Sequence, residues 1–157
     1  MTEDLQSFVL LLDEGFDRAA WHGPSLLASL RGVTVDQLLH RPRRGVHNAW
    51  ELAVHSAYWK HAVRNRILGG SRDSFALAGS NFFPRDKGLT LADWKRDRAL
   101  LVREHKALRA VVAGLDPGKL DLKVAGSRHT LRRTVLGIAA HDIYHAGQIA
   151  LLKRLAA

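Results

Sequence analysis

Helical periodicity recurs along four long stretches of this chain, and no stretch keeps the alternating apolar pattern of a β-strand. The first stretch carries apolar residues at spacings of three and four: Leu5, Phe8, Val9, Leu12 and Phe16. Residues at such spacings share one face of an α-helix. A chain whose apolar stripes all lie on helices buries them by packing helix against helix. The sequence therefore predicts an all-α fold, a four-helix bundle.

Local signals set the limits of the predicted helices. Capping residues start a helix, and glycine or proline breaks or ends one. On these signals we expect helices over residues 3–30, 48–68, 90–113 and 130–155. The first is interrupted at Gly23-Pro24, and a short helical turn begins at Thr34. Residues 120–128 fit either an irregular segment or a small hairpin.

The longest connection, residues 71–88, is rich in Gly, Ser, Asn and Pro. Connections of this length in a compact domain are often functional and form a lid or the wall of a pocket. Within it, Asn81-Phe82-Phe83-Pro84 offers aromatic rings to such a wall. We therefore expect this connection to border the functional cleft and to be among the more mobile segments.

Composition limits the class of protein. The length of 157 residues fits one domain, residues 1–157, with enough core to fold without a structural metal. The absence of cysteine excludes disulfides, thiolate metal sites and cysteine nucleophiles, and it fits a reducing compartment. The acidic start of the chain lacks the basic region of a signal peptide, and no apolar run reaches about 18 residues. We expect a cytoplasmic protein with no membrane partner.

The net charge of +9 is high for a small domain and raises the possibility of a nucleic-acid partner. The arginines, however, are scattered in small groups, such as Arg43-Arg44 and Arg132-Arg133. The last predicted helix is too apolar in its middle to read bases in a groove. We therefore expect at most weak, non-specific DNA binding that moderate salt abolishes.

Function is best indicated by His141 and His145, which lie four residues apart in an apolar stretch near the C-terminus. On a helix they share one face, one turn apart, so that both imidazoles can bind one divalent metal ion. The spacing alone is weak evidence, because nine histidines in this chain produce such pairs by chance. Two ligands also hold a metal loosely, since catalytic zinc sites usually have three protein ligands.

Two other histidines are candidates for the third position. His55 lies on an apolar and aromatic face of the second predicted helix, where it is either a hydrogen-bonded core histidine or a metal ligand. His22 lies at the predicted break in the first helix, where it either lines a pocket or packs against a helix end. His61 and His105 have charged neighbours, and we expect both to be solvated.

Three segments together resemble a known family. Residues 21–26, 47–55 and 141–149 follow one another as in the DinB-like superfamily, and they are most similar to its YfiT-like branch of metal-dependent hydrolases. With the order of the predicted helices, the resemblance spans nearly the whole chain. It implies a bundle of up-down-down-up topology and a homodimer. It also implies a divalent metal ion, zinc or nickel, bound by His55, His141 and His145.

Such a site supports two kinds of reaction on a small-molecule substrate. Three neutral imidazoles leave the ion its full charge and an open position, where a bound water becomes acidic enough for hydrolysis. The same position accommodates a low-molecular-weight thiol, which must be a co-substrate because the protein has none of its own. Proteins similar to this one include thiol-dependent transferases and isomerases.

The neighbours of the histidines have expected roles as well. Asp142 is either an acceptor for a hydrogen bond from a ligand or a surface charge. Tyr144 and Gln148 lie within one turn of a ligand and are placed to line its open side. Trp50 and Trp59 are expected in the core of the bundle, with a pocket wall as the second interpretation.

Two non-enzymatic hypotheses accompany the enzyme. One is a binding or sequestration protein on the same scaffold that contacts DNA through its arginines. The other is a dimeric metal-binding scaffold without turnover. The metal content of the protein distinguishes the enzyme and the metal-binding scaffold from a metal-free binding protein. A steep salt dependence of DNA retention favours the DNA-binding hypothesis.

Overall fold

The computed structural model describes residues 2–70 and 73–157, and within this part of the chain no β-strand forms. The prediction of an all-α protein is therefore confirmed. The helices are α1 (Glu3–Phe16), α2 (Leu26–Ser29), α3 (Val35–Leu39), α4 (Ala49–Ile67), α5 (Leu91–Ala113) and α6 (Leu131–Leu155), with a 3-10 turn at Pro117–Lys119.

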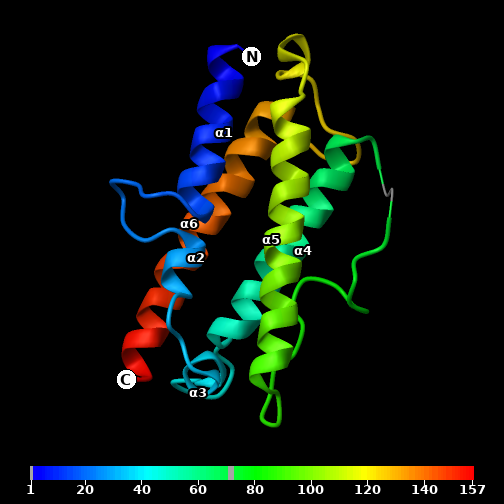
Figure 1. The fold of residues 1–157 in the computed structure, drawn as a ribbon. Coiled ribbons are helices and arrows are strands. Elements are labelled where there is room, and N and C mark those ends of the chain that lie inside the picture. Colours follow the sequence, from blue (N-terminus) through cyan, green and yellow to red (C-terminus); the bar gives the residue numbers. More distant parts are fainter. Residues whose placement is uncertain (1, 71–72) are drawn as a thin grey trace.

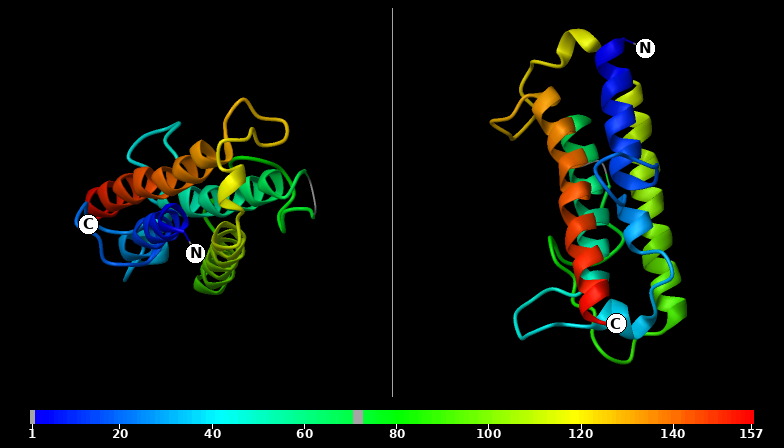
Figure 2. Two further views of the ribbon diagram at one scale, coloured as in Figure 1. Left: turned by 90° about the horizontal axis from the view of Figure 1, so that it is seen from above. Right: turned by 90° about the vertical axis from the view of Figure 1, so that its left-hand side faces the viewer.

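The four long helices, α1, α4, α5 and α6, form the body of the molecule (Figure 1). α4 packs most extensively against α5 and also lies against α6, whereas α1 lies against α6 and α5. α1 and α6 run in one direction, and α4 and α5 run in the other (Figures 1 and 2). The short helices add to this frame, because α2 packs on α6 and α3 packs on α4.

Buried apolar side chains form two clusters along the bundle. One surrounds Trp50 and joins the first half of α4 to α2 and the second half of α6. The other surrounds Leu108 and joins α1 to the second half of α5 and the first half of α6. Along α6 the second cluster ends at Ala139 and the first begins at Ala146, so the His141–His145 turn lies between them.

Local caps explain why most predicted helix starts are confirmed. Reciprocal capping boxes open α3, α4 and α5, with the cap side chains of Thr34, Asn48 and Thr90. The Thr130 hydroxyl accepts a hydrogen bond from the backbone N–H of Arg133 at the start of α6. Each cap satisfies a backbone donor that the first turn of a helix leaves without a partner. These boundaries therefore depend on a few neighbouring residues and not on the tertiary fold.

The first helix is shorter than predicted. α1 ends at Phe16, ahead of the expected break at Gly23-Pro24, and residues 17–24 cross to α2 as a loop. The apolar stripe stops at Phe16, and the three residues that follow are exposed. A longer α1 would have ordered more backbone without burying more apolar surface, and helices in proteins depend on such burial.

The segment that precedes α6 is an irregular turn and not a hairpin of two strands. A single bridge pairs Lys123 with Thr130, and the backbone N–H of Val124 donates to the carbonyl of His129 at 3.0 Å. This turn places His129 and Val124 beside the first turns of α6. Among the helices of the described part, none combines the length and the apolarity needed to cross a bilayer.

Candidate functional site

Three histidines converge where the middle of α4 meets the middle of α6. His55 comes from α4, and His141 and His145 come from successive turns of α6. The Nε2 atom of His141 lies 3.1 Å from the Nε2 atoms of both His55 and His145. In each ring a potential ligand atom lies within 4.8 Å of those in the other two. The three predicted ligands are therefore brought together, and His22 is not part of the group.

The outer nitrogens of two rings fix how these rings are oriented. The Nδ1 of His55 donates to the carbonyl oxygen of Asn81 at 2.9 Å, and the Nδ1 of His145 donates to Oε1 of Gln148 at 2.6 Å. A neutral imidazole that donates from Nδ1 keeps a lone pair on Nε2. His55 and His145 thus direct free lone pairs toward His141, as metal-binding histidines do when a neighbour holds the other nitrogen.

Burial keeps the three rings neutral. It lowers the pKa of His141 to about 3, with further lowering from the neighbouring His145 and His55. Burial likewise lowers the pKa of His145 to about 4 and lowers the pKa of His55. Neutral imidazole is the form that binds a metal, so the group needs no deprotonation at neutral pH.

The spacing of the Nε2 atoms fits one metal ion. Three nitrogen ligands at about 2.0–2.1 Å from a common ion lie about 3.0–3.4 Å from one another. The two Nε2–Nε2 distances of 3.1 Å fall in this range. Within the group, hydrogen bonding cannot satisfy all three nitrogens, because only His141 is free to carry its proton on Nε2. A donor set of three imidazoles suits a divalent transition-metal ion such as zinc, copper, iron or nickel.

The connection between α4 and α5 covers one side of the histidine group. The Phe82 ring stacks on His55, with 4.1 Å between centroids, and on its other face it stacks on His47 at 3.7 Å. Asn81, in the left-handed region with φ of 64°, presents its carbonyl to His55 and its side-chain oxygen to Trp59 Nε1. The described part of the predicted connection thus borders the site. Residues 71–72 lie outside the described residues, and the mobility of the connection stays a prediction.

Glu51 holds this connection against the start of α4. Its buried carboxylate accepts hydrogen bonds from the guanidinium of Arg41, from Nδ1 of His47 and from the backbone N–H of Arg85. Burial alone raises its pKa, but the bonds from Arg41 and His47 outweigh burial and lower the pKa to about 2. Glu51 also closes the capping box of α4 with Asn48, which is a local feature, whereas its long-range partners follow from the fold.

Both interpretations of Asp142 are wrong. Asp142 is fully buried and forms an ion pair with Lys60 of α4, which is also fully buried. It therefore neither accepts a hydrogen bond from a ligand nor lies on the surface. No local pattern predicts Lys60 as a core residue, because its helical face becomes internal only through packing against α6. The buried Nδ1 of His141 has no hydrogen-bond partner in the described part of the chain.

The predicted exposure of His61 and His105 is also wrong. His61 is 5% exposed and lies against Asn65 and Glu104, and His105 is 3% exposed and stacks on Phe16 at 3.7 Å between centroids. The charged sequence neighbours of both residues favoured the wrong prediction, because packing of α4 on α5 buries His61 and packing against Phe16 of α1 buries His105. Burial lowers the pKa of His105 to about 2.

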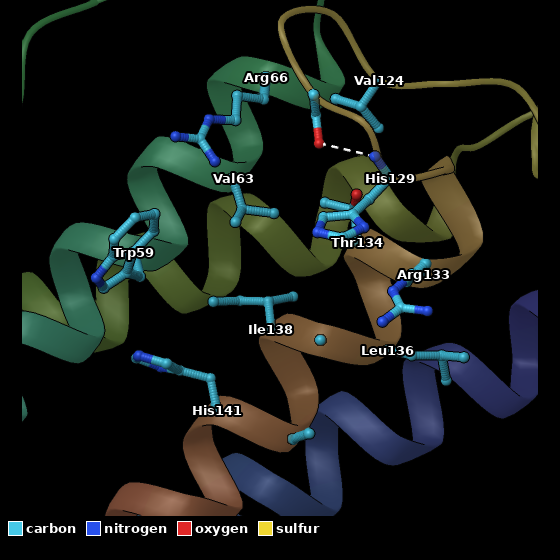
Figure 3. Close-up of a pocket in the computed structure, with 13 residues that line it drawn as sticks. Trp59, Val63, Arg66, Val124, His129, Arg133, Thr134, Leu136, Ile138 and His141 are labelled. Carbon is cyan, nitrogen blue, oxygen red and sulfur yellow. Dashed lines mark hydrogen bonds between the residues drawn. The ribbon is translucent and has the colours of Figure 1, made fainter.

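Two cavities flank the histidine group. One, of about 480 Å³, lies between α4 and α6 and reaches His141 and Trp59 (Figure 3). The other, of about 490 Å³, reaches His145, His47 and Gln148. Tyr144 also lines this second cavity, as expected for a residue on the open side. Trp50, by contrast, is fully buried in the core.

Comparison with family models identifies the fold family. The model of the DinB superfamily matches residues 19–149, most of the chain. The protein belongs to the DinB superfamily. Residues 19–149 include His55, His141 and His145, so the histidine group lies in the matched region of this DinB protein. No curated protein and no solved structure gives a significant match.

Proposed function

We propose that this DinB protein is a metal-dependent enzyme that binds zinc or nickel through the Nε2 atoms of His55, His141 and His145. The convergence of three neutral imidazoles on one point, with cavities on two sides, carries this proposal. When bound, the ion supplies a Lewis acid that makes a water or a thiol acidic at neutral pH. A buried histidine group without a ligand would leave nitrogen lone pairs unsatisfied, at a cost of about 1–3 kcal/mol each.

The second cavity offers a proton acceptor from the chain itself. The Nδ1 of His47 donates to the Glu51 carboxylate at 2.9 Å, which leaves the Nε2 lone pair of His47 free. A carboxylate that holds an imidazole in this way orients it as a general base. We assign His47 Nε2 as the atom that takes the proton of the nucleophile, with Glu51 as a positioning residue.

Two cavities of similar volume favour group transfer between two small molecules, because each cavity can hold one of them. Hydrolysis needs a cavity for one substrate only. In the proposed reaction a low-molecular-weight thiol enters beside His145 and loses its proton to His47. Its sulfur then forms a bond to an electrophilic carbon of the second substrate, and the leaving group departs with the bonding electrons. Hydrolysis, in which water replaces the thiol, is the alternative within the same site.

The test supplies zinc- or nickel-loaded protein with a low-molecular-weight thiol and chlorodinitrobenzene, and separately with nitrophenyl acetate and no thiol. We expect thioether formation that depends on metal and falls at least about 100-fold in His141→Ala, because removal of a ligand empties the site. Ester hydrolysis without thiol would make the protein a hydrolase. Neither reaction across a panel of thiols and esters would favour a non-catalytic binding protein.

The role of His47 has its own test. His47→Gln is expected to lower kcat at least about 100-fold with unchanged metal content, because general-base catalysis contributes about 10²–10⁴-fold. A variant that keeps the kcat of the wild type would remove His47 from the mechanism.

Several finer assignments belong to the same proposal. The YfiT-like branch is supported by the order of residues 21–26, 47–55 and 141–149, and the opposite directions of the α1/α6 and α4/α5 pairs support the up-down-down-up topology. The homodimer, the cytoplasmic location and the weak, non-specific DNA binding stay predictions. Light scattering and a salt titration of DNA retention are the measurements that check the dimer and the DNA binding.

A further inference from the structure

The cavity beside His141 has an apolar body and basic groups along its wall. Val63 and Ile138 line it from α4 and α6, and Leu136 lies farther toward the start of α6 (Figure 3). Arg66 and Arg133 line it from the same two helices, and His129 lines it from the turn before α6. No Asp or Glu of the described residues lines this cavity.

Arg66 and Arg133 differ from many other arginines of the described chain in having no ion pair. Arg41, Arg64, Arg109 and Arg132 each pair with a carboxylate. Arg66 and Arg133 form no ion pair with any acidic residue of the described chain, although both are exposed at the cavity. The Arg66 guanidinium instead lies over the ring of Trp59, 5.5 Å from its centroid. This contact keeps its positive charge above the cavity and leaves its N–H donors without a partner among the described residues.

The arginines and the histidine group lie at different ends of the cavity. Arg133 precedes His141 by eight residues on α6, which corresponds to about 12 Å along the helix. The apolar side chains of Ile138 and Val63 line the cavity together with the two ends. A ligand that fills the cavity therefore needs an anionic end for the arginines, an apolar middle and a second end near His141.

We propose that this cavity binds an elongated small-molecule carboxylate, whose carboxylate contacts Arg66 and Arg133 and whose other end lies beside His141. The inference rests on the proposed function for its role as the substrate site, and it names the substrate class. Guanidinium groups match carboxylates because their parallel N–H donors pair with two oxygens. The apolar wall selects against small inorganic anions, which gain nothing from burying apolar surface.

The second cavity sharpens this assignment. It is lined by Leu52, Leu151 and Leu152 as well as His47 and His145, and no Arg, Lys, Asp or Glu of the described residues lines it. The two sides of the histidine group therefore differ in charge. A carboxylate-bearing substrate gains its charge-assisted hydrogen bonds on the His141 side, whereas an uncharged group suits the His145 side.

The experiment compares phenylbutyrate with phenylbutyramide, which has the same apolar body and no charge. Calorimetric titration into metal-free protein measures both dissociation constants, so that neither ligand binds through a metal. We expect the carboxylate to bind at least about tenfold more tightly than the amide, the size of one or two charge-assisted hydrogen bonds. The double variant Arg66→Gln/Arg133→Gln should bind the two equally.

A control of matched charge is Arg43→Gln/Arg44→Gln, in which two exposed arginines outside the cavity are replaced. This control should keep the carboxylate preference within about twofold of the wild type, because screening weakens distant charges. Equal binding of the two ligands to the wild type, no binding of either, or a preference that survives in Arg66→Gln/Arg133→Gln would overturn the inference.

A repetition with zinc-loaded protein separates this inference from the proposed function. If the ion is absent or inert but the arginine-dependent preference appears in metal-free protein, only the enzyme proposal fails. If zinc binds and thioether forms but the preference is absent, only the substrate class fails. A carboxylate that coordinates zinc directly is recognised because its affinity would persist in Arg66→Gln/Arg133→Gln.

Discussion

α4 and α6 bury two groups of polar side chains close to each other, and the two groups differ in charge. One is a pair of opposite charges, and the other is uncharged. Lys60 and Asp142 are fully buried and pair with each other across the helix interface. Burial lowers the pKa of Lys60 and raises that of Asp142, and the attraction between the two charges opposes both shifts. In the neighbouring group, His55, His141 and His145 face one another as three neutral rings of one kind.

The difference teaches how to separate structural polar residues from functional ones. The two charges of an ion pair compensate each other, so their burial needs no external ion, although Oδ1 of Asp142 has no hydrogen-bond partner in the described part of the chain. Three imidazole lone pairs that meet at one point have no such counterpart within their group, and for this reason we propose that they bind a cation. Both groups lie on the same helices, and His141 is directly followed by Asp142. Titratable type and burial alone therefore do not identify a site; the two groups differ in whether opposite charges within the group compensate each other.

The largest effect is expected when the ion pair is broken on one side. Lys60→Met leaves Asp142 buried without a counter-charge, and we expect the free energy of unfolding to fall by about 3–5 kcal/mol. Urea unfolding measures this change in the free energy of unfolding. The double variant Lys60→Met/Asp142→Leu should recover most of this loss, because it removes both charges from the core. A loss below about 1 kcal/mol in the single variant would contradict a structural role for the pair.

Replacement of one histidine should instead weaken metal binding strongly and change the stability of the protein little. His55→Ala is expected to weaken zinc or nickel binding at least about 100-fold, because two imidazoles remain of three. The free energy of unfolding of the metal-free protein should change by less than about 2 kcal/mol, since the chain has enough core to fold without metal. Metal titration and circular dichroism measure the two. His129→Ala is the control, and unchanged affinity in His55→Ala would remove His55 from the ligand set.

A change of pH tests Glu51, a buried carboxylate whose charge is balanced by Arg41. Although burial raises the pKa of Glu51, the hydrogen bonds from Arg41 and His47 lower this pKa in the folded protein to about 2, from its ordinary value of 4.5. Its contribution to stability is therefore fully present above the unfolded pKa and is lost as pH falls through the folded pKa. Glu51→Gln should be less stable by about 2 kcal/mol at neutral pH, and this difference should shrink as pH falls below about 4.5. A difference that stays constant with pH would show that hydrogen-bond geometry, not charge, explains the role of Glu51.

The smallest effect is expected from the residue that orients a ligand. Gln148→Leu removes the acceptor for Nδ1 of His145, and we expect metal affinity to fall about tenfold, as for other residues that orient ligands. Gln148→Glu restores an acceptor and should restore the affinity. If Gln148→Leu binds metal as tightly as the wild type, packing alone orients His145.

Features of the fold that depend on neighbouring residues are predicted correctly from the sequence. The caps at Asn48, Thr90 and Thr130 involve neighbours within one turn, and helical periodicity placed His141 and His145 on one face. The burial of a residue is predicted wrongly where it depends on which faces of the helices contact each other. Lys60 and His105 have charged or polar neighbours in sequence, and only the contacts between helices bury them.

The two cavities show the same limit. Arg66 and Arg133 are 67 positions apart in the chain, and neither has a sequence pattern that predicts a shared cavity. The connection that covers His55 was recognised by its length and composition, but the contacts of Asn81 and Phe82 with the imidazole required the fold. Sites built from distant segments therefore need the tertiary structure, even when each helix is predicted correctly.

X-ray absorption spectroscopy of zinc-loaded protein without an affinity tag tests the central claim most directly. We predict one zinc ion per chain and a first shell that contains three imidazole nitrogens at about 2.0–2.1 Å, recognised by the multiple scattering of the rings. In His141→Ala this imidazole signal should be lost or reduced. A zinc shell made only of oxygen atoms, or a spectrum unchanged in His141→Ala, would contradict a metal site formed by His55, His141 and His145.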